Sequence, residues 1–423
     1  MNRYLHRIQE LEVQDARSVF FLRSGYFQTS LLPNLRVLKW DTSYAGTIQY
    51  IKPLLCPSLV YLDLTSFEED ERALSSFFRT LPSRCPGLTT IRVNSHSQYD
   101  AEFKDSLSQA LYSFKNLKCV TVYPWVHDET LQHLFMSSKF EELCFTTDKV
   151  HLAEFSPPPC DIPFRNVKKL DLWLSNLCPI VGLLRPDDQK FHQVTIHLCN
   201  LELPRAMGSL FNGLSSRTQK SPLRSLRIDS PDLHSRENSA FYVLSFETFQ
   251  PLTFLGNLRE LSIQLENPVS LSDEEVAEVA RGWPLLEAFE LCCIRHSPAK
   301  WITLKGLLLL AAVCPKLHHV GLTLDARQVP TEVPVPVGSQ FNTITRMHFP
   351  NSPIENVRAI GKLLRTYFPS LTSAGRWERY RWGQHQESAD NVEWRGVWEY
   401  LDYSRTRKDN DNVHAEPGAD GSG

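Results

Sequence analysis

The chain has 423 residues, and its 45 lysines and arginines nearly balance 48 aspartates and glutamates, giving a net charge of -3. The two signs are interspersed, so the sequence has no concentrated positive surface of the kind that binds nucleic acid or an anionic membrane. The first residues form no signal-peptide core, and the longest apolar stretch, 306–314, is too short to span a membrane. We therefore expect an intracellular protein, cytoplasmic or nuclear, with no nucleic-acid or membrane partner.

A short apolar pattern returns along the whole chain about every 28 residues. Apolar residues occupy the first, fourth and sixth positions of each copy, and the copies begin at Ile8, Leu35, Leu59, Leu88, Leu117, Phe140, Val167, Phe191, Leu223, Leu258, Leu286, Leu317, Ile344 and, in a degenerate form, Leu371. Six copies have a proline two residues before the first apolar position: Pro33, Pro57, Pro86, Pro284, Pro315 and Pro369. Because proline disfavours helix in the residue before it, each of these prolines indicates that a helix ends and a strand begins.

Between the copies, apolar residues at helical spacing predict helices over 70–81, 100–114, 272–283, 303–314 and 353–368. Ser272 stands three residues before Glu275, which is the arrangement of a capping box at a helix start. Two stretches that lack this spacing, 229–242 and the proline-rich 325–340, are predicted to be loops. The resulting order is strand, helix, strand, helix, with all strands parallel.

This alternation predicts an α/β fold, a leucine-rich-repeat solenoid of about 13 repeats over residues 1–371. Neighbouring strands lie about 4.8 Å apart, whereas packed helices need about 10 Å, so the sheet must curve toward its strands. We therefore expect a horseshoe with parallel strands on the concave face and helices on the convex face. Residues 372–403, with four tryptophans, are expected to cap the last repeat, and the polar residues 404–423 to be a disordered tail.

The reactive residue types do not fall into catalytic or metal-binding patterns. Strand alternation separates His318 from His319 and Cys292 from Cys293, which sends neighbouring side chains to opposite faces. No phosphate loop, nucleophile elbow or carboxylate pair occurs in a supporting context. Ten cysteines without a CxxC pair are expected to be reduced and mostly buried. We therefore expect no enzyme activity, no cofactor and no metal; an enzyme with a site in its loops is the remote alternative.

The strand entries CPSL at 56–59, CPGL at 85–88 and CPKL at 314–317 carry a resemblance to a known family. Up to about residue 400 the chain resembles the leucine-rich region of F-box proteins, especially the large families of mushroom-forming fungi. In that family an F-box docks the Skp adaptor of a cullin-based SCF-type ubiquitin ligase, and the horseshoe selects the protein to be ubiquitinated. The resemblance therefore implies the substrate-recognition part of such a ligase.

The F-box itself is not recognisable in this sequence, because the first strand copy already begins at Ile8. We therefore expect a truncated gene product or a missing partner, and expect Skp and cullin as partners only if an F-box is supplied elsewhere. The alternative is a free-standing leucine-rich scaffold or inhibitor with no role in ubiquitination. In each case the expected partner is a protein whose identity the sequence does not give.

Side chains between the apolar positions of each strand point away from the core, so the register predicts which residues line the concave face. The residues expected to bind a protein partner are Lys39, Asp41, Tyr61, Asp63, Arg92, Asn94, Tyr123, Lys169, Asp171, Trp173, His197, Arg227, Asp229, Glu260, Gln264, Glu290 and His348. Tyrosine, tryptophan and arginine are typical anchors of protein interfaces. We expect the segment from Tyr123 to Asp229 to hold the hot spot.

Overall fold

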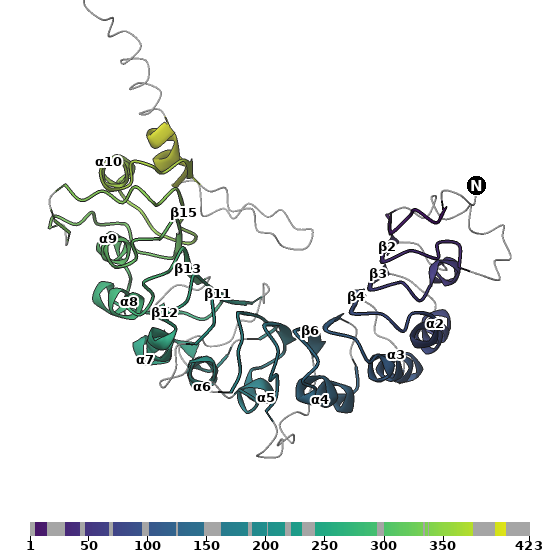
Figure 1. Cartoon of the computed structure of the whole chain (residues 1–423). Coiled ribbons are helices and arrows are strands. Elements are labelled where there is room, and N and C mark those ends of the chain that lie inside the picture. Colours follow the sequence, from purple (N-terminus) through teal and green to yellow (C-terminus); the bar gives the residue numbers. More distant parts are fainter. Residues whose placement is uncertain are drawn as a thin grey trace, which may run out of the picture. The chain divides into compact units, whose positions relative to one another are not determined.

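In the computed structural model, strands and helices alternate along the chain (Figure 1). By their internal contacts the residues divide into two compact units. Unit 1 consists of Met1–Asn200 with Ser221–Leu223, and unit 2 of Leu201–Lys220 with Arg224–Gly423. The structure describes residues 5–14, 30–42, 47–66, 71–94, 101–123, 126–147, 162–184, 188–200, 202–215, 221–230, 242–293, 300–332, 335–336, 338–374 and 394–402. The predicted solenoid, residues 1–371, therefore includes parts of both units.

Parallel strands that follow one another in chain order form the sheet of unit 1. They are β1 (Glu10–Val13), β2 (Val37–Thr42), β3 (Tyr61–Ser66), β4 (Thr90–Asn94), β5 (Cys119–Val122), β6 (Glu142–Thr147), β7 (Lys169–Leu174) and β8 (Gln193–Leu198). The helical segments between them are η2 (Ile48–Tyr50), η3 (Lys52–Leu54), α2 (Glu71–Arg84), α3 (Ala101–Ser113), α4 (Asp128–Met136) and α5 (Cys178–Val181). Each strand begins at the third residue of a predicted copy of the apolar pattern, and most strands extend one or two residues past the end of the copy.

The core of unit 1 lies between its sheet and its helices. One apolar residue from each of β2 to β8 aligns in register with the next to form a row across the sheet: Leu38, Leu62, Ile91, Val120, Leu143, Leu170 and Val194. All of these are at most 2% exposed. Helices α2 and α3 add Phe77, Phe78 and Phe103, whose rings meet edge to face at 5.3 and 5.7 Å. Burial of each such ring contributes about 2 to 3 kcal/mol, which is why the helices lie against the sheet.

Unit 2 has the same layering. Its parallel strands are β9 (Ser225–Asp229), β11 (Glu260–Leu265), β13 (Ala288–Cys293), β14 (His319–Leu322), β15 (Arg346–His348) and β16 (Ser373–Ala374), and a separate pair joins β10 (Leu244–Ser245) to β12 (Val269–Ser270). Its helices are α6 (Pro204–Leu214), α7 (Phe246–Phe249), η6 (Gln250–Phe254), α8 (Asp273–Ala280), α9 (Leu304–Val313) and α10 (Val357–Tyr367). The corresponding buried row is Leu226, Leu261, Phe289, Val320 and Met347.

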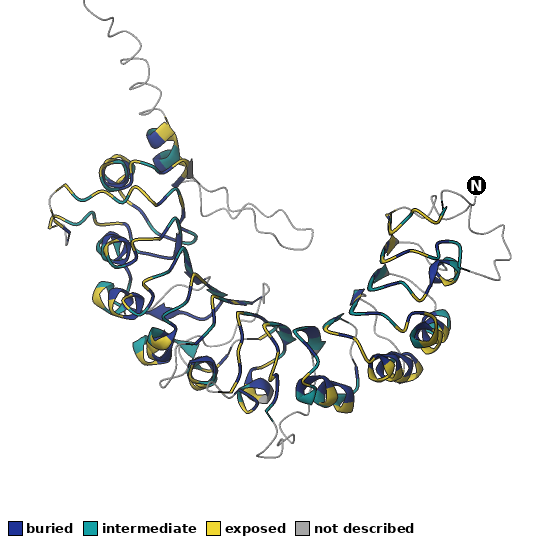
Figure 2. Cartoon of the chain, in the orientation of Figure 1, coloured by how far each residue is buried: buried dark blue, intermediate teal, exposed yellow. Residues whose placement is uncertain are grey.

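In each unit the helices lie on one side of the sheet. The face of each helix toward the sheet is buried, and the opposite face is exposed (Figure 2). We call the other side of the sheet the open face. Along β7, for example, Leu170, Leu172 and Leu174 are buried toward the helices. The intervening Lys169, Asp171 and Trp173 are partly exposed on the open face.

The predicted α/β order of parallel strands and helices is confirmed. The five predicted helices correspond to α2, α3, α8, α9 and α10, and the capping box between Ser272 and Glu275 is present. Helix α10 begins at Val357, later than predicted, because Ile354 pairs as a β-bridge with Ala326 and Asn356 caps the helix. Within the described parts of the chain, no helix has the length and apolar character needed to cross a bilayer.

The region predicted to cap the last repeat, 372–403, is described over 372–374, which includes β16, and over 394–402, which is helical. Its Trp394 is 2% exposed and its ring lies 4.6 Å from that of Phe349, while the ring of Trp398 stacks on Phe349 at 6.0 Å. These contacts cover the carboxyl-terminal side of β15. Trp377 and Trp382, the predicted tail 404–423 and most of the predicted loop 229–242 lie outside the described residues.

Candidate protein-binding face

The residues predicted to bind a partner lie on β-strands or directly after them, on the open faces of both units. Unit 1 holds Lys39, Asp41, Tyr61, Asp63, Arg92, Asn94, Tyr123, Lys169, Asp171, Trp173 and His197, and unit 2 holds Arg227, Asp229, Glu260, Gln264, Glu290 and His348. All are exposed or half-buried except His348, which is only 6% exposed. His348 is buried because its ring lies over Gly321 of the neighbouring strand.

The open face of unit 1 contains a hollow of about 320 Å³. It is lined by side chains from β3 to β7 and the ends of these strands: Asp63, Thr65, Arg92, Asn94, Thr121, Tyr123, Glu142, Leu143, Cys144, Lys169 and Asp171. Its wall combines three acidic groups with two basic ones and a phenol. Such a lining offers hydrogen-bond donors and acceptors of both signs, which suits a polar or zwitterionic ligand such as a polypeptide segment.

Three aromatic rings, which follow β5 or lie on β7 and β8, pack together at one side of this hollow. Trp173 stacks on His197 with ring centroids 4.2 Å apart, and its other contact is an edge-to-face packing with Tyr123 at 6.3 Å. His197 Nε2 lies 3.5 Å from a carboxylate oxygen of Asp171. Among the described residues, the indole nitrogen of Trp173 has no hydrogen-bond partner although it is buried. A buried donor of this kind is costly unless a bound molecule or water accepts its hydrogen bond.

A second group of contacts lies on β3 and β4. The Tyr61 hydroxyl donates a hydrogen bond to Asp63 at 3.1 Å, and the guanidinium of Arg92 lies 5.6 Å from the centre of the Tyr61 ring. Arg92 is also 3.9 Å from the Asp63 carboxylate, yet its side chain remains 44% exposed. Arg92 is thus held by a ring and a carboxylate while its other donors remain available to a partner.

Burial shifts the ionisation of groups in the hollow. Desolvation raises the pKa of Tyr123, and it raises the pKa of Cys144 to about 12, so both groups are neutral at physiological pH. Burial also raises the pKa of Asp63, against the hydrogen bond from Tyr61 and the charge of Arg92, which lower it. The Cys144 thiol therefore serves as a weak donor, to the Tyr123 hydroxyl at 3.6 Å, rather than as a thiolate nucleophile.

Among the cysteines that the structure describes, we predict that alkylation under native, mildly alkaline conditions modifies Cys178 first. That side chain is exposed, whereas Cys85, Cys144 and Cys314 are buried and have a pKa raised to about 12. Compared with an ordinary thiol, the fraction of each in the reactive thiolate form is therefore roughly a thousandfold lower. Peptide mapping by mass spectrometry over time measures the order, with the guanidinium-unfolded chain as control. Early alkylation of Cys144 in the native chain would contradict the packing described here.

The predicted residues of unit 2 form separate contacts. Arg227 donates to Asp229 at 3.0 Å, and Glu260 accepts a hydrogen bond from Ser225 at 3.1 Å. Gln264 donates to Glu290 at 2.7 Å. The segment expected to hold the hot spot is thus divided: Tyr123 to His197 gather in unit 1, and Arg227 and Asp229 belong to unit 2.

Sequence reasoning missed several open-face side chains that line the hollow or contact the predicted residues. In unit 1 these are Thr65, Thr121, Glu142 and Cys144, and in unit 2 they are Ser262, Cys292 and His319. Each stands at an outward position of its strand, so the same alternation that identified the others was sufficient to find them.

No protein-family model matches this chain, and a search of curated proteins finds no matching sequence. What the open faces do must therefore be argued from their own geometry. That geometry consists of mixed charges and partly exposed aromatic rings, arranged on rows of parallel strands.

Proposed function

We propose that this chain is a protein-binding module of the leucine-rich-repeat type. In this proposal its units form a horseshoe of about 13 repeats, with strands on the concave side and helices on the convex side. The support is the order seen in each unit, where parallel strands follow one another along the chain and helices cover only one face. Because helices are wider than strand spacing, continued stacking of this kind curves a sheet toward its open face.

The observation that carries the binding role is the open face of unit 1. There Tyr61, Arg92 and Trp173 lie around or beside a polar hollow, and these are the residue types in which binding energy concentrates at protein interfaces. Each is held in place by contacts on neighbouring strands, so little conformational entropy is lost when a partner binds. Acidic and basic groups interspersed among them favour a partner surface of mixed charge rather than a polyanion.

The resemblance to F-box proteins suggests what such binding is for. We propose that the partner is a protein selected for ubiquitination, with this chain supplying substrate recognition. Docking on the Skp adaptor and its cullin would need an F-box from elsewhere, and the described residues provide recognition only. A pull-down in which this chain alone bound the Skp adaptor tightly would overturn that division of roles.

Reversing the charge of one open-face arginine tests the binding role. We expect Arg92→Glu to weaken partner recovery about 30-fold, because loss of a hot-spot residue typically costs about 2 kcal/mol. The matched control is Arg79→Glu on α2: Arg79 is also about half exposed and paired with one carboxylate, that of Glu102, but it lies on the helical side. Recovery is measured by quantitative mass spectrometry of proteins retained by each tagged variant.

The control separates loss of binding from loss of folding. Both variants should keep the circular dichroism and melting temperature of the unchanged chain, since each replaces an exposed side chain. Partners lost with Arg92→Glu but kept with Arg79→Glu support the open face as the binding surface. Equal recovery with both variants, or loss with Arg79→Glu alone, would contradict it.

A further inference from the structure

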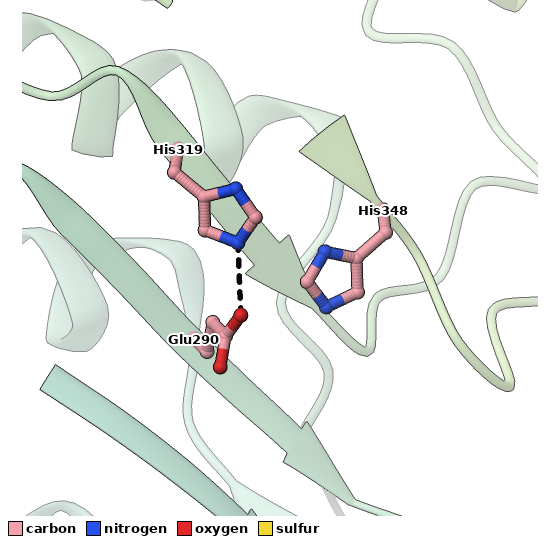
Figure 3. A group of neighbouring side chains, drawn as sticks. All are labelled: Glu290, His319 and His348. Atoms are coloured by element: carbon pink, nitrogen blue, oxygen red, sulfur yellow. Dashed lines mark hydrogen bonds and ion pairs between the residues drawn. The ribbon is translucent and has the colours of Figure 1, made fainter. Parts of the chain in front are cut away.

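Three metal-ligating side chains meet on the open face of unit 2 (Figure 3). Glu290 comes from β13, His319 from β14 and His348 from β15, so three consecutive strands contribute one side chain each. One donor atom from each lies within 4.8 Å of the other two. The side chains converge in Figure 3, with the carboxylate of Glu290 directed at the ring of His319. Bonds of about 2.0–2.1 Å to a tetrahedral zinc ion would place such donors about 3.3 Å apart, so small side-chain rotations would suffice.

A glycine makes room for this cluster. Glu290, Gly321 and His348 occupy one rung of the sheet, with Gly321 in the middle. A Cβ atom at position 321 would lie 2.3 Å from Cε1 and 2.4 Å from Nε2 of His348, and 3.1 Å from the Glu290 side chain. Only the absence of a side chain there lets the two outer residues of the rung approach each other.

Hydrogen bonds from β11 hold the carboxylate in place. Oxygen Oε2 of Glu290 accepts from the Ser262 hydroxyl at 2.5 Å and from the Gln264 amide at 2.7 Å. Its other oxygen, Oε1, lies 2.8 Å from Nε2 of His319. Ser262 and Gln264 therefore orient the carboxylate through one oxygen, while the other oxygen faces the imidazoles. Residues that hydrogen-bond to a metal ligand commonly fix its orientation in this way.

We propose that Glu290, His319 and His348 form a binding site for a divalent transition metal of the zinc type. Two imidazoles and one carboxylate are a ligand set that zinc takes in proteins, with a further coordination position left open. Imidazole ligands favour such an ion over magnesium or calcium. The side chains of Glu290 and His319 are each 19% exposed, so the cluster borders solvent and its open position can take water or a donor atom of a bound molecule. The site is independent of the proposed protein-binding role.

Metal titration of the tag-free full chain, stripped of metal, tests this site. We expect one equivalent of Zn²⁺ to bind in competition with a chromophoric chelator, and Co²⁺ to give the visible absorption of a tetrahedral site. Loss of one ligand, in His319→Gln or Glu290→Gln, should weaken Zn²⁺ binding at least about a hundredfold, since removal of an outer residue alone costs 10- to 100-fold. The control, His318→Gln, changes the adjacent histidine, which is outside the cluster.

Thermal melting gives a second readout that does not depend on the chelator. Zn²⁺ should raise the melting temperature of the unchanged chain and of His318→Gln, but not of His319→Gln, because only a folded site binds the ion. Circular dichroism without metal establishes that each variant is folded. Absence of Zn²⁺ binding to the unchanged chain would overturn the proposal whatever the variants do. Equal loss of binding in His318→Gln and His319→Gln would overturn it as well.

Discussion

Replacing Trp394 with alanine is expected to destabilise unit 2 by about 3 to 5 kcal/mol, the usual cost of removing a buried tryptophan. Its ring is 2% exposed and packs 4.6 Å from Phe349 and 5.7 Å from Trp398. Its indole nitrogen donates to the Ser352 carbonyl at 2.7 Å, so truncation leaves both a cavity and an unpaired buried acceptor. The ring of Tyr400, on the helix at 394–402, lies against Gly361 of α10. If this helix detaches, that surface of α10 becomes exposed.

Hydrogen exchange of the backbone amides of β15 and α10 measures this loss locally, without assuming that the whole chain unfolds in one step. Trp394→Phe is the matched control, because it keeps a buried ring but removes the hydrogen bond, and it should cost only about 1 to 2 kcal/mol. Unchanged protection of α10 in Trp394→Ala would show that residues 394–402 do not cap this end of unit 2.

Two glycine-to-alanine substitutions in unit 2 should shift stability in opposite directions. A Cβ atom on Gly282 would lie 2.4 Å from the carbonyl oxygen and 2.7 Å from the Cα of Thr253, which are backbone atoms of η6. This backbone has little freedom to move, because the neighbouring Trp283 donates to the Leu252 carbonyl at 2.7 Å. Gly282→Ala should therefore destabilise the chain by about 1 to 3 kcal/mol, the cost of overpacking.

Gly208→Ala is the counterpart on α6. A Cβ atom there meets nothing within 4 Å, and alanine is the better helix former, so we expect a gain of about 0.5 to 1 kcal/mol. Urea unfolding followed by circular dichroism compares both variants with the unchanged chain. A destabilised Gly208→Ala, or a Gly282→Ala as stable as the unchanged chain, would contradict the helix packing of unit 2.

The sequence was sufficient to predict the strands because their signal is local. Each copy alternates buried and outward residues, and this period places Leu62 and Leu170 in the core of unit 1 and Leu261 in the core of unit 2. Helix ends were predictable where a cap is encoded nearby, as at Ser272. The pairing of β10 with β12 was not predicted, because it depends on two short segments that approach only in the folded chain.

The sequence predicted on which side of the sheet the site residues lie, but not which of their side chains contact one another. Alternation alone assigned Glu290 to the open face, yet it gave no reason to connect it with His319 or His348. Along the chain, alternation separates His319 from the neighbouring His318, whereas the folded sheet brings His319 and His348 together across strands. A signal was present, since Glu290, Gly321 and His348 stand at the same position of their respective copies, with glycine between two large polar residues.

Site-specific photo-crosslinking is the most direct test of the claim that the open face binds another polypeptide. A photoreactive phenylalanine derivative replaces either Tyr61, on the open face of unit 1, or Tyr112, which is 42% exposed on α3 of the helical side. We predict that irradiation in cell extract yields covalent adducts with a partner protein from position 61 and not from position 112. Adducts from position 112 with none from position 61 would contradict it.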